Sequence, residues 1–125
     1  MTYTFILNGE TPAKKNSRLN LSSGRSIPSA NFRKWHESAL IQVIMQRNRI
    51  LNFKKATKEN PCAIKLTFTH GDMKRRDSDN GTSSILDLLT DSGILEDDSW
   101  LIVRNISVFN CYQKNSAKCQ VEISF

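Results

Sequence analysis

Strand-like and helix-like hydrophobic spacings alternate along this chain, and their order constrains the fold more than any other feature. Alternating or strand-like patterns predict four strands, over residues 2–8, 63–69, 101–112 and 117–125. A turn around 114–116 would join the last two strands as a hairpin. With a helical pattern after the first strand and another after the second, we expect a single α/β (α+β) domain. It would have a mixed sheet of about four strands and two main helices.

The helical patterns define the two helices. The first is expected from a cap at Asn31 to about Arg49, and the second over about 80–92, where Gly93 ends it. The first carries one apolar stripe at helical spacing, made of Phe32, Trp35, His36, Ala39, Leu40 and Val43. Ile41, Ile44 and Met45 widen the stripe, which indicates either deep packing or a subunit contact. We interpret the aromatic residues of the stripe as core.

The chain length suits one domain over residues 1–125, without internal repeats. No apolar stretch approaches a membrane span, and the N-terminus lacks the apolar region of a signal peptide. Cys62, Cys111 and Cys119 are an odd number and have no metal-ligand spacing, which argues against a disulfide framework and a zinc site. We therefore expect a reduced, cytoplasmic protein.

Charge is unevenly distributed. Residues 72–98 hold eight acidic and three basic residues, a net charge of −5, whereas the whole chain carries +6. The remainder is therefore strongly basic, at +11. Part of it is a long basic loop over about 9–30, which we expect to be mobile and to carry function. An acidic segment in a basic protein fits either a solvated helix and loop or a carboxylate site facing a polyanion.

The acidic residues of this segment form two pairs. Asp77 and Asp79 follow a predicted strand, and Asp97 and Asp98 precede the next one. If the segment 93–96 returns the chain, the second pair lies beside the first at one end of the sheet. Converging carboxylates suit Mg²⁺ or Mn²⁺, which prefer oxygen ligands. An EF-hand does not fit, because its spacing fails when counted from Asp77.

These residues carry a resemblance. Residues 76–80 read RDSDN, residues 87–89 read DLL and residues 92–98 read SGILEDD. The pattern resembles the RusA family of Holliday junction resolvases, which shows an R-D-x-D-N run, a short helix with Asp-x-Leu, a Gly and a closing Asp-Asp at this spacing. Residues 12–18, PAKKNSR, are similar to the family's basic N-terminal segment.

The resemblance implies a homodimeric, Mg²⁺-dependent endodeoxyribonuclease (Mn²⁺ being the alternative ion) that cuts four-way or other branched DNA in recombination and repair. Asp77, Asp79 and Asp98 match the family's catalytic, metal-binding carboxylates, and Asp97 is a further candidate ligand. The residues expected to contact the DNA backbone are Lys14, Lys15, Arg18, Lys74, Arg75 and Arg76.

One position departs from the family. The lysine that usually stands four residues after the second aspartate is Ser83 here. That lysine is thought to assist at the phosphate, where a cation stabilises developing charge. Two alternatives therefore stay open: a weak or inactive relative that still binds DNA, and a non-enzymatic protein whose acidic helix docks a basic partner.

The other polar and aromatic residues have ordinary interpretations. Asp87 and Asp91, four apart on one helix face, are expected to be solvated or to support the site. Trp100 is expected to pack against the protein rather than to stack on a base. His70 is expected at an exposed strand end, with a general-base or phosphate-binding role as the alternative.

Overall fold

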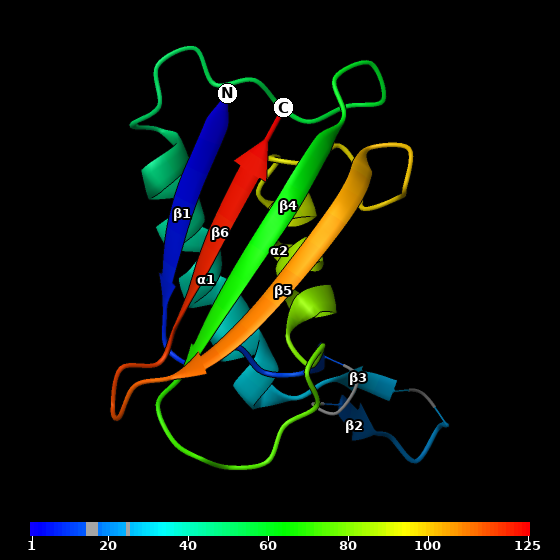
Figure 1. The fold of residues 1–125 in the computed structure, drawn as a ribbon. Helices are drawn as coiled ribbons and strands as arrows, with labels where there is room; N and C mark the ends of the chain where they lie inside the picture. Colours follow the sequence, from blue (N-terminus) through cyan, green and yellow to red (C-terminus); the bar gives the residue numbers. More distant parts are fainter. Residues whose placement is uncertain (15–17, 25) are drawn as a thin grey trace.

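The computed structural model describes residues 1–14, 18–24 and 26–125 (Figure 1). Its elements are β1 (Thr2–Asn8), β2 (Arg18–Asn20), β3 (Ser26–Pro28), α1 (Ala30–Arg47), β4 (Cys62–His70), α2 (Thr82–Asp91), β5 (Val103–Tyr112) and β6 (Lys118–Ser124). The main sheet has the strand order β1-β6-β4-β5. β4 and β5 are parallel and the other neighbours are antiparallel. The predicted mixed sheet of four strands with two helices is confirmed.

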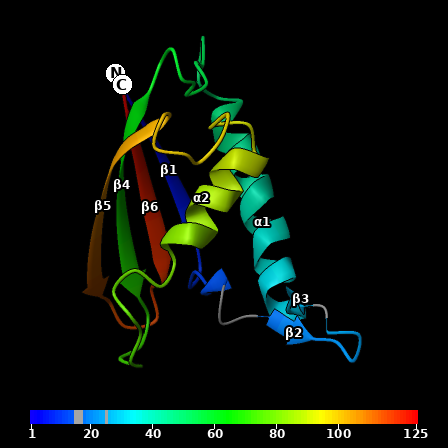
Figure 2. The ribbon, with the colours of Figure 1, turned by 90° about the vertical axis from the view of Figure 1, so that its right-hand side faces the viewer.

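Both helices cover the same face of the main sheet, as the view along its edge shows (Figure 2). Strand alternation supplies that face: Phe5 of β1, Leu66 of β4 and Val121 of β6 are fully buried. Ile85 and Leu88 of α2 are also fully buried against it. Each such side chain contributes about 1.5–3 kcal/mol to folding. None of the helices within the described part of the chain is long and apolar enough to cross a bilayer.

The predicted hairpin of the last two strands is wrong. β4 lies between β5 and β6, so the chain from β5 to β6 crosses the end of β4. This connection is held there by hydrogen bonds from the Gln113 N–H to the His70 carbonyl and from the Asn115 N–H to the Gly71 carbonyl, both 3.0 Å. The physical reason is burial: β6 buries every second side chain completely, which suits a central strand. β5 is exposed along most of its length and lies at the edge.

Two local predictions near α1 also need correction. Ser29, not Asn31, caps the helix, because its Oγ accepts a hydrogen bond from the Phe32 N–H at 3.1 Å. The segment predicted as one basic loop contains the short antiparallel pair β2–β3. Of the residues that widen the apolar stripe, Ile41 and Met45 are exposed, so they are not part of the core.

The outer edge of β1 is closed by α1. Gln46 Nε2 donates to the Ile6 carbonyl (2.7 Å), and its Oε1 accepts from the Ile6 N–H (2.8 Å). Gln42 Oε1 accepts from the Asn8 N–H at 2.8 Å. These side chains occupy backbone groups that would otherwise pair with another strand. The opposite edge, formed by β5, has no partner strand among the described residues.

Candidate functional site

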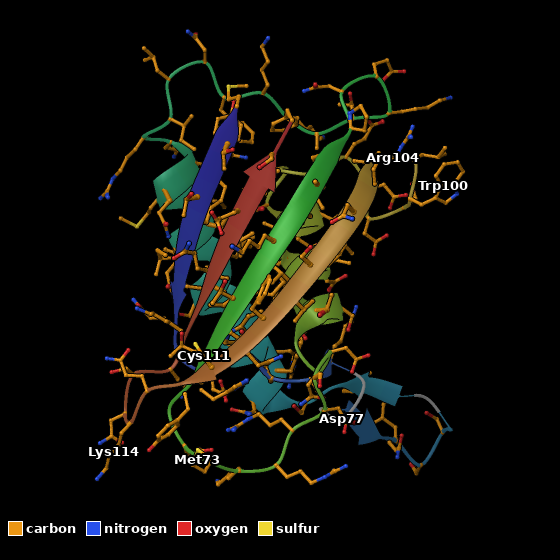
Figure 3. The ribbon with its side chains drawn as sticks, in the orientation of Figure 1. Met73, Asp77, Trp100, Arg104, Cys111 and Lys114 are labelled. Carbon is orange, nitrogen blue, oxygen red and sulfur yellow. The ribbon has the colours of Figure 1, made fainter. Side chains whose placement is uncertain are left out.

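The two acidic pairs lie at opposite ends of α2. Asp77 and Asp79 follow the carboxyl end of β4, whereas Asp98 follows α2 and precedes β5. β4 and β5 are parallel, and the Cys62 N–H donates to the Ile102 carbonyl where both strands start (2.8 Å). Asp98 therefore lies at the amino end of β4. Figure 3 shows Asp77 at one end of the sheet and Trp100, two residues after Asp98, at the other.

This separation is too large for one shared ion. The ten residues of α2 span about 15 Å, and the nine residues of β4 span about 30 Å. Ligand oxygens of one Mg²⁺ lie only about 2.1 Å from the ion. The predicted convergence of both pairs within one chain is thus not found. The reason is topological, because a helix that joins two parallel strands must carry the chain from one end of the sheet to the other.

Asp77 and Asp79 sit in the turn that leads into α2. Their backbone carbonyls accept hydrogen bonds from the Asn80 N–H (3.0 Å) and the Thr82 N–H (3.1 Å). Both side chains are exposed, and the Asp77 carboxylate lies 3.7 Å from the Arg75 guanidinium. Exposed oxygen-only ligands suit a hard cation that keeps several waters. These two residues therefore fit part of a Mg²⁺ site, as do the exposed Asp97 and Asp98 at the other end.

The neighbouring basic residues differ in what they contact. Arg76 is held inside the protein: its Nε lies 2.8 Å from Glu10 Oε1, and its Nη1 lies 2.9 Å from Asp72 Oδ1. The hydrogen bond from Arg76, with that from the Lys74 N–H, lowers the pKa of the Asp72 carboxyl below its usual value. In contrast, Arg75 has a side chain that is 91 % exposed, so it is the arginine here that can reach a phosphate.

The basic loop is described only in part. The Lys14 ammonium pairs with Asp87 Oδ2 at 3.1 Å. The Lys14 N–H donates to Ser84 Oγ (3.1 Å), and Ser84 Oγ donates to the Pro12 carbonyl (2.6 Å), which fixes this part of the loop against α2. Lys15 lies outside the described residues, and Arg18 begins β2. Ser83 is exposed on the first turn of α2.

A hydrogen-bonded network that no sequence pattern revealed supports the segment that carries Asp77 and Asp79. His70 Nδ1 lies 2.7 Å from Glu10 Oε1, and His70 Nε2 lies 2.8 Å from Asn110 Oδ1. Asn110 Nδ2 donates to the Ser78 carbonyl, between the two aspartates, at 3.0 Å. His70 was expected at an exposed strand end, but it links β4 to β5 and to the segment that follows β1. Glu10 could have been found, because it is the only acidic residue in 9–28.

A cavity of about 300 Å³ opens beside this network. It is lined by His70, Asp72, Met73, Lys74, Arg76, Ser78, Asn110, Cys111 and Tyr112. Basic and hydrogen-bonding groups around an open cavity, next to two exposed carboxylates, make a surface that can hold a phosphate and a cation together.

Trp100, at the other end of the sheet, was expected to pack against the protein. Its side chain is instead 71 % exposed, and the Arg104 guanidinium lies 5.5 Å from its ring centre.

Comparison with known proteins bears on this geometry. No curated protein matches the chain. A family model described as "Endodeoxyribonuclease RusA" matches residues 9–124, from the basic loop to the end of β6. The match includes both acidic pairs, Ser83 and the basic segments. The chain therefore belongs to the RusA family of endodeoxyribonucleases, which are Holliday junction resolvases that act on branched DNA.

Proposed function

We propose that this protein is a Mg²⁺-dependent endonuclease that resolves four-way DNA junctions by phosphodiester hydrolysis. The family match carries the proposal, and the exposed pair Asp77 and Asp79 beside Arg75 supports it. Asp77, Asp79 and Asp98 would hold Mg²⁺, with Asp97 as a further candidate ligand. When bound, Mg²⁺ lowers the pKa of a water ligand and neutralises charge on the phosphate. Free cysteines, two of them buried, support a cytoplasmic location.

The residues around the site have distinct tasks in this proposal. Arg75 and Lys74, both exposed, bind phosphates of the DNA backbone. Arg76 instead positions the loop, because both of its carboxylate partners belong to the protein. Asn110 keeps the backbone at Ser78 in place and thereby orients the two neighbouring aspartates. Lys14, Lys15 and Arg18 supply further contacts from the basic loop.

The separation of Asp79 from Asp98 favours a homodimer in which each site uses both chains. A site that contains Asp77, Asp79 and Asp98 cannot form in one chain, since these residues lie at opposite ends of α2. A twofold dimer in which the two chains run in opposite directions brings the partner's Asp98 to Asp77 and Asp79. It also provides two equivalent sites, one for each of the two strands that a resolvase must cut.

The free edge of β5 is the interface that we propose. Two β5 strands that pair antiparallel place the start of one strand against the end of the other. The start of β5 follows Asp98 by five residues, and its end reaches the Ser78 carbonyl through Asn110. Ile106, Phe109 and Tyr112 leave large apolar surfaces exposed on this strand. The edge of β1 is less suited, because Gln46 and Gln42 already occupy it.

The proposal is tested with a labelled four-way junction, purified protein and Mg²⁺. We expect paired nicks from the wild type, and loss of cleavage but not of junction binding in Asp79→Asn. Glu37→Gln, which removes one exposed negative charge from α1, away from both acidic pairs, is the matched control and should cleave normally. A shifted junction without cleavage under Mg²⁺ or Mn²⁺ would instead favour the DNA-binding relative, for which Ser83 is the motivating observation.

The remaining alternative, an acidic helix that docks a basic protein, has less support. Asp87 and Asp91 of α2 are already paired within the chain, with Lys14 and His36. A helix whose charges are satisfied internally offers little to a basic partner. Strong loss of DNA affinity with rising salt would argue that the partner is a nucleic acid, because Lys and Arg that bind phosphates release counterions from the DNA. Absence of DNA binding at low salt would contradict both nucleic-acid functions.

A further inference from the structure

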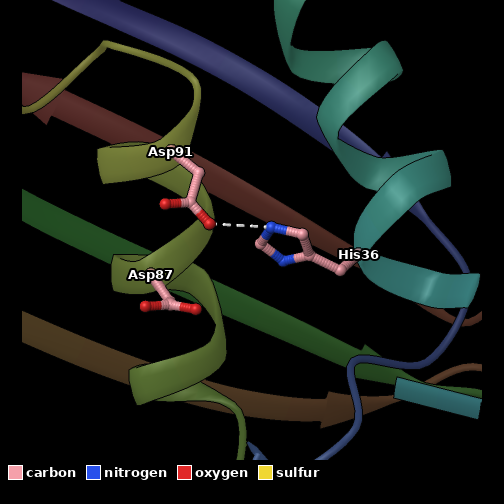
Figure 4. Close-up of side chains that lie close together, drawn as sticks. All are labelled: His36, Asp87 and Asp91. Carbon is pink, nitrogen blue, oxygen red and sulfur yellow. Dashed lines mark ion pairs between the residues drawn. The ribbon is translucent and has the colours of Figure 1, made fainter. Parts of the chain in front are cut away.

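A second cluster of ion-binding side chains lies between α1 and α2, away from the acidic pairs. It borders a cavity of about 290 Å³ lined by Lys14, Phe32, Arg33, His36, Glu37, Asp87 and Asp91. Asp87 and Asp91 are one helical turn apart, so both carboxylates point from α2 towards α1. His36 reaches them from α1, and Figure 4 shows its ring directed at the two acids.

The three side chains are arranged as ligands of one ion. One ligand atom from each of His36, Asp87 and Asp91 lies within 4.8 Å of the other two. In the described parts of the chain, no other three residues drawn from His, Cys, Asp and Glu come this close together. His36 Nε2 lies 2.9 Å from Asp91 Oδ2. Its Nδ1 is buried without a hydrogen-bond partner, and Nε2 is the ring nitrogen that contacts Asp91. Ligands of a tetrahedral ion lie about 3.4 Å apart, so the His36–Asp91 pair would open slightly and Asp87 would adjust by a small side-chain rotation.

Two groups contact the carboxylates when no ion is bound. The Lys14 ammonium lies 3.1 Å from Asp87 Oδ2, and the His36 ring occupies Asp91. Two carboxylates on one helix face repel each other unless a positive charge lies between them. A divalent ion supplies that charge more fully than Lys14. An incoming ion would also repel the lysine from Asp87.

We propose that His36 Nε2 and the carboxylates of Asp87 and Asp91 bind one divalent transition-metal ion of the Zn²⁺ class, and that the ion displaces Lys14. A nitrogen ligand with two carboxylates favours Zn²⁺ over Mg²⁺ or Ca²⁺, because imidazole suits the softer ion. Bound there, the ion links α1 to α2 and frees Lys14 for another partner. The site is separate from Asp79, which lies eight residues before Asp87, and does not depend on the nuclease proposal.

The test is calorimetric titration of the full chain with Zn²⁺ alone, without Mg²⁺. A Cys111→Ser background removes the exposed thiol as a competing ligand. We expect one bound ion per chain. Affinity should fall more than about a hundredfold in His36→Asn and in Asp91→Asn, since even partners outside the ligand shell contribute 10–100-fold. Asp91 is an exposed residue at the end of α2, so its variant tests the site if His36→Asn fails to fold.

Three controls make the result decisive. Glu37→Gln removes a negative charge from the same cavity without removing a ligand, and should bind Zn²⁺ as the wild type does. Asp77→Asn/Asp79→Asn should lose junction cleavage yet keep Zn²⁺ binding, which separates this site from the nuclease proposal. Lys14→Met should bind Zn²⁺ several-fold more tightly. Wild-type affinity in Asp91→Asn, or no Zn²⁺ binding at all, would overturn the site. Unchanged affinity in Lys14→Met would overturn the displacement of the lysine.

Discussion

Asp79 and Asp98 lie at opposite ends of α2, although both belong to the sequence pattern that resembles the RusA family and both fall within the matched residues. The parallel pairing of β4 and β5 imposes this separation, since a crossover helix must return the chain to the start of the next strand. Any ion that uses both residues must therefore be held between two chains. The quaternary structure becomes part of the proposed chemistry and not only a way to present two sites.

Mixing two inactive variants tests this two-chain site. Asp79→Asn and Asp98→Asn should each be inactive alone. In a mixed dimer, one site combines both substitutions and the other is wild type, because the intact Asp79 and the intact Asp98 come from different chains. After subunit exchange, a one-to-one mixture should regain about a quarter of the wild-type nicks, by random assortment of a C₂ dimer. No recovery after verified exchange would place the complete site within one chain.

Strand and helix positions were predictable because they depend on local periodicity. The predicted strand at 2–8 and the helices near 31–49 and 80–92 all exist, with ends shifted by a few residues. The pairing of β5 was not predictable in the same way, since it depends on which strand can bury a whole face. Strand β6 can bury a whole face, through Cys119, Val121 and Ile123, whereas β5 cannot.

For the candidate site too, the sequence predicts which residues matter but not how they are arranged in space. Residue type and spacing along the chain gave the two acidic pairs, and the resemblance to the RusA family made Asp77, Asp79 and Asp98 the candidates. Their places in space follow from the parallel β4–β5 pair. Recognition of a strand–helix–strand unit would have predicted the separation, because its two loops lie at opposite ends. The cluster of His36, Asp87 and Asp91 joins two helices that meet only in the folded chain, so no local pattern could reveal it.

A lysine at position 83, where the resemblance to the RusA family expects one, should increase the junction cleavage rate. Ser83 is exposed on the first turn of α2, so Ser83→Lys places an ammonium near the proposed site without displacing core residues. Loss of a transition-state donor typically costs 10²–10³-fold in kcat, so we expect the added lysine to raise the junction cleavage rate by about tenfold or more. Single-turnover cleavage measures this, with Ser83→Ala as the control. An unchanged rate would show that another cation already fills this role.

The two neighbouring arginines should behave differently. Arg75→Ala should weaken junction binding and reduce the salt dependence by about one counterion, with little change in the free energy of unfolding. Arg76→Ala should lower the free energy of unfolding by about 1.5–3 kcal/mol, because it loses its charged partners Glu10 and Asp72. Binding isotherms at several salt concentrations and urea unfolding separate these effects. Equal stability losses in both variants would contradict the assignment.

Thiol reactivity should distinguish the three cysteines. Burial raises the pKa of Cys62 to about 11 and that of Cys119 to about 12, whereas Cys111 is exposed. Near pH 8, a thiol reagent should therefore modify one cysteine of the native protein quickly and the other two only after unfolding. An unfolded thiol titrates near 9, so the stabilising effect of the buried neutral thiols is complete below that pH. It should be lost as pH rises towards 11–12, which urea unfolding at alkaline pH will detect as a falling midpoint.

The closed edge of β1 should depend on Gln46. Replacing it with alanine removes both hydrogen bonds to the Ile6 backbone, each worth about 0.5–1.5 kcal/mol. Since water can reach this edge, we expect a loss near the lower end, about 1 kcal/mol in total. Gln46→Glu should also destabilise, because a carboxylate can accept from the Ile6 N–H but repels the Ile6 carbonyl.

The same variant tests why β5 is the open edge of the main sheet in the described part of the chain. With the edge of β1 uncovered, Gln46→Ala should self-associate more strongly at high concentration, as unpaired strand edges do. Light scattering at increasing protein concentration will show this, and Gln113→Ala, which changes an exposed glutamine in the β5–β6 connection, is the control. If Gln46→Ala and Gln113→Ala unfold and associate alike, the glutamines of α1 do not protect β1. The choice of β5 as the dimer edge would then lose its structural reason.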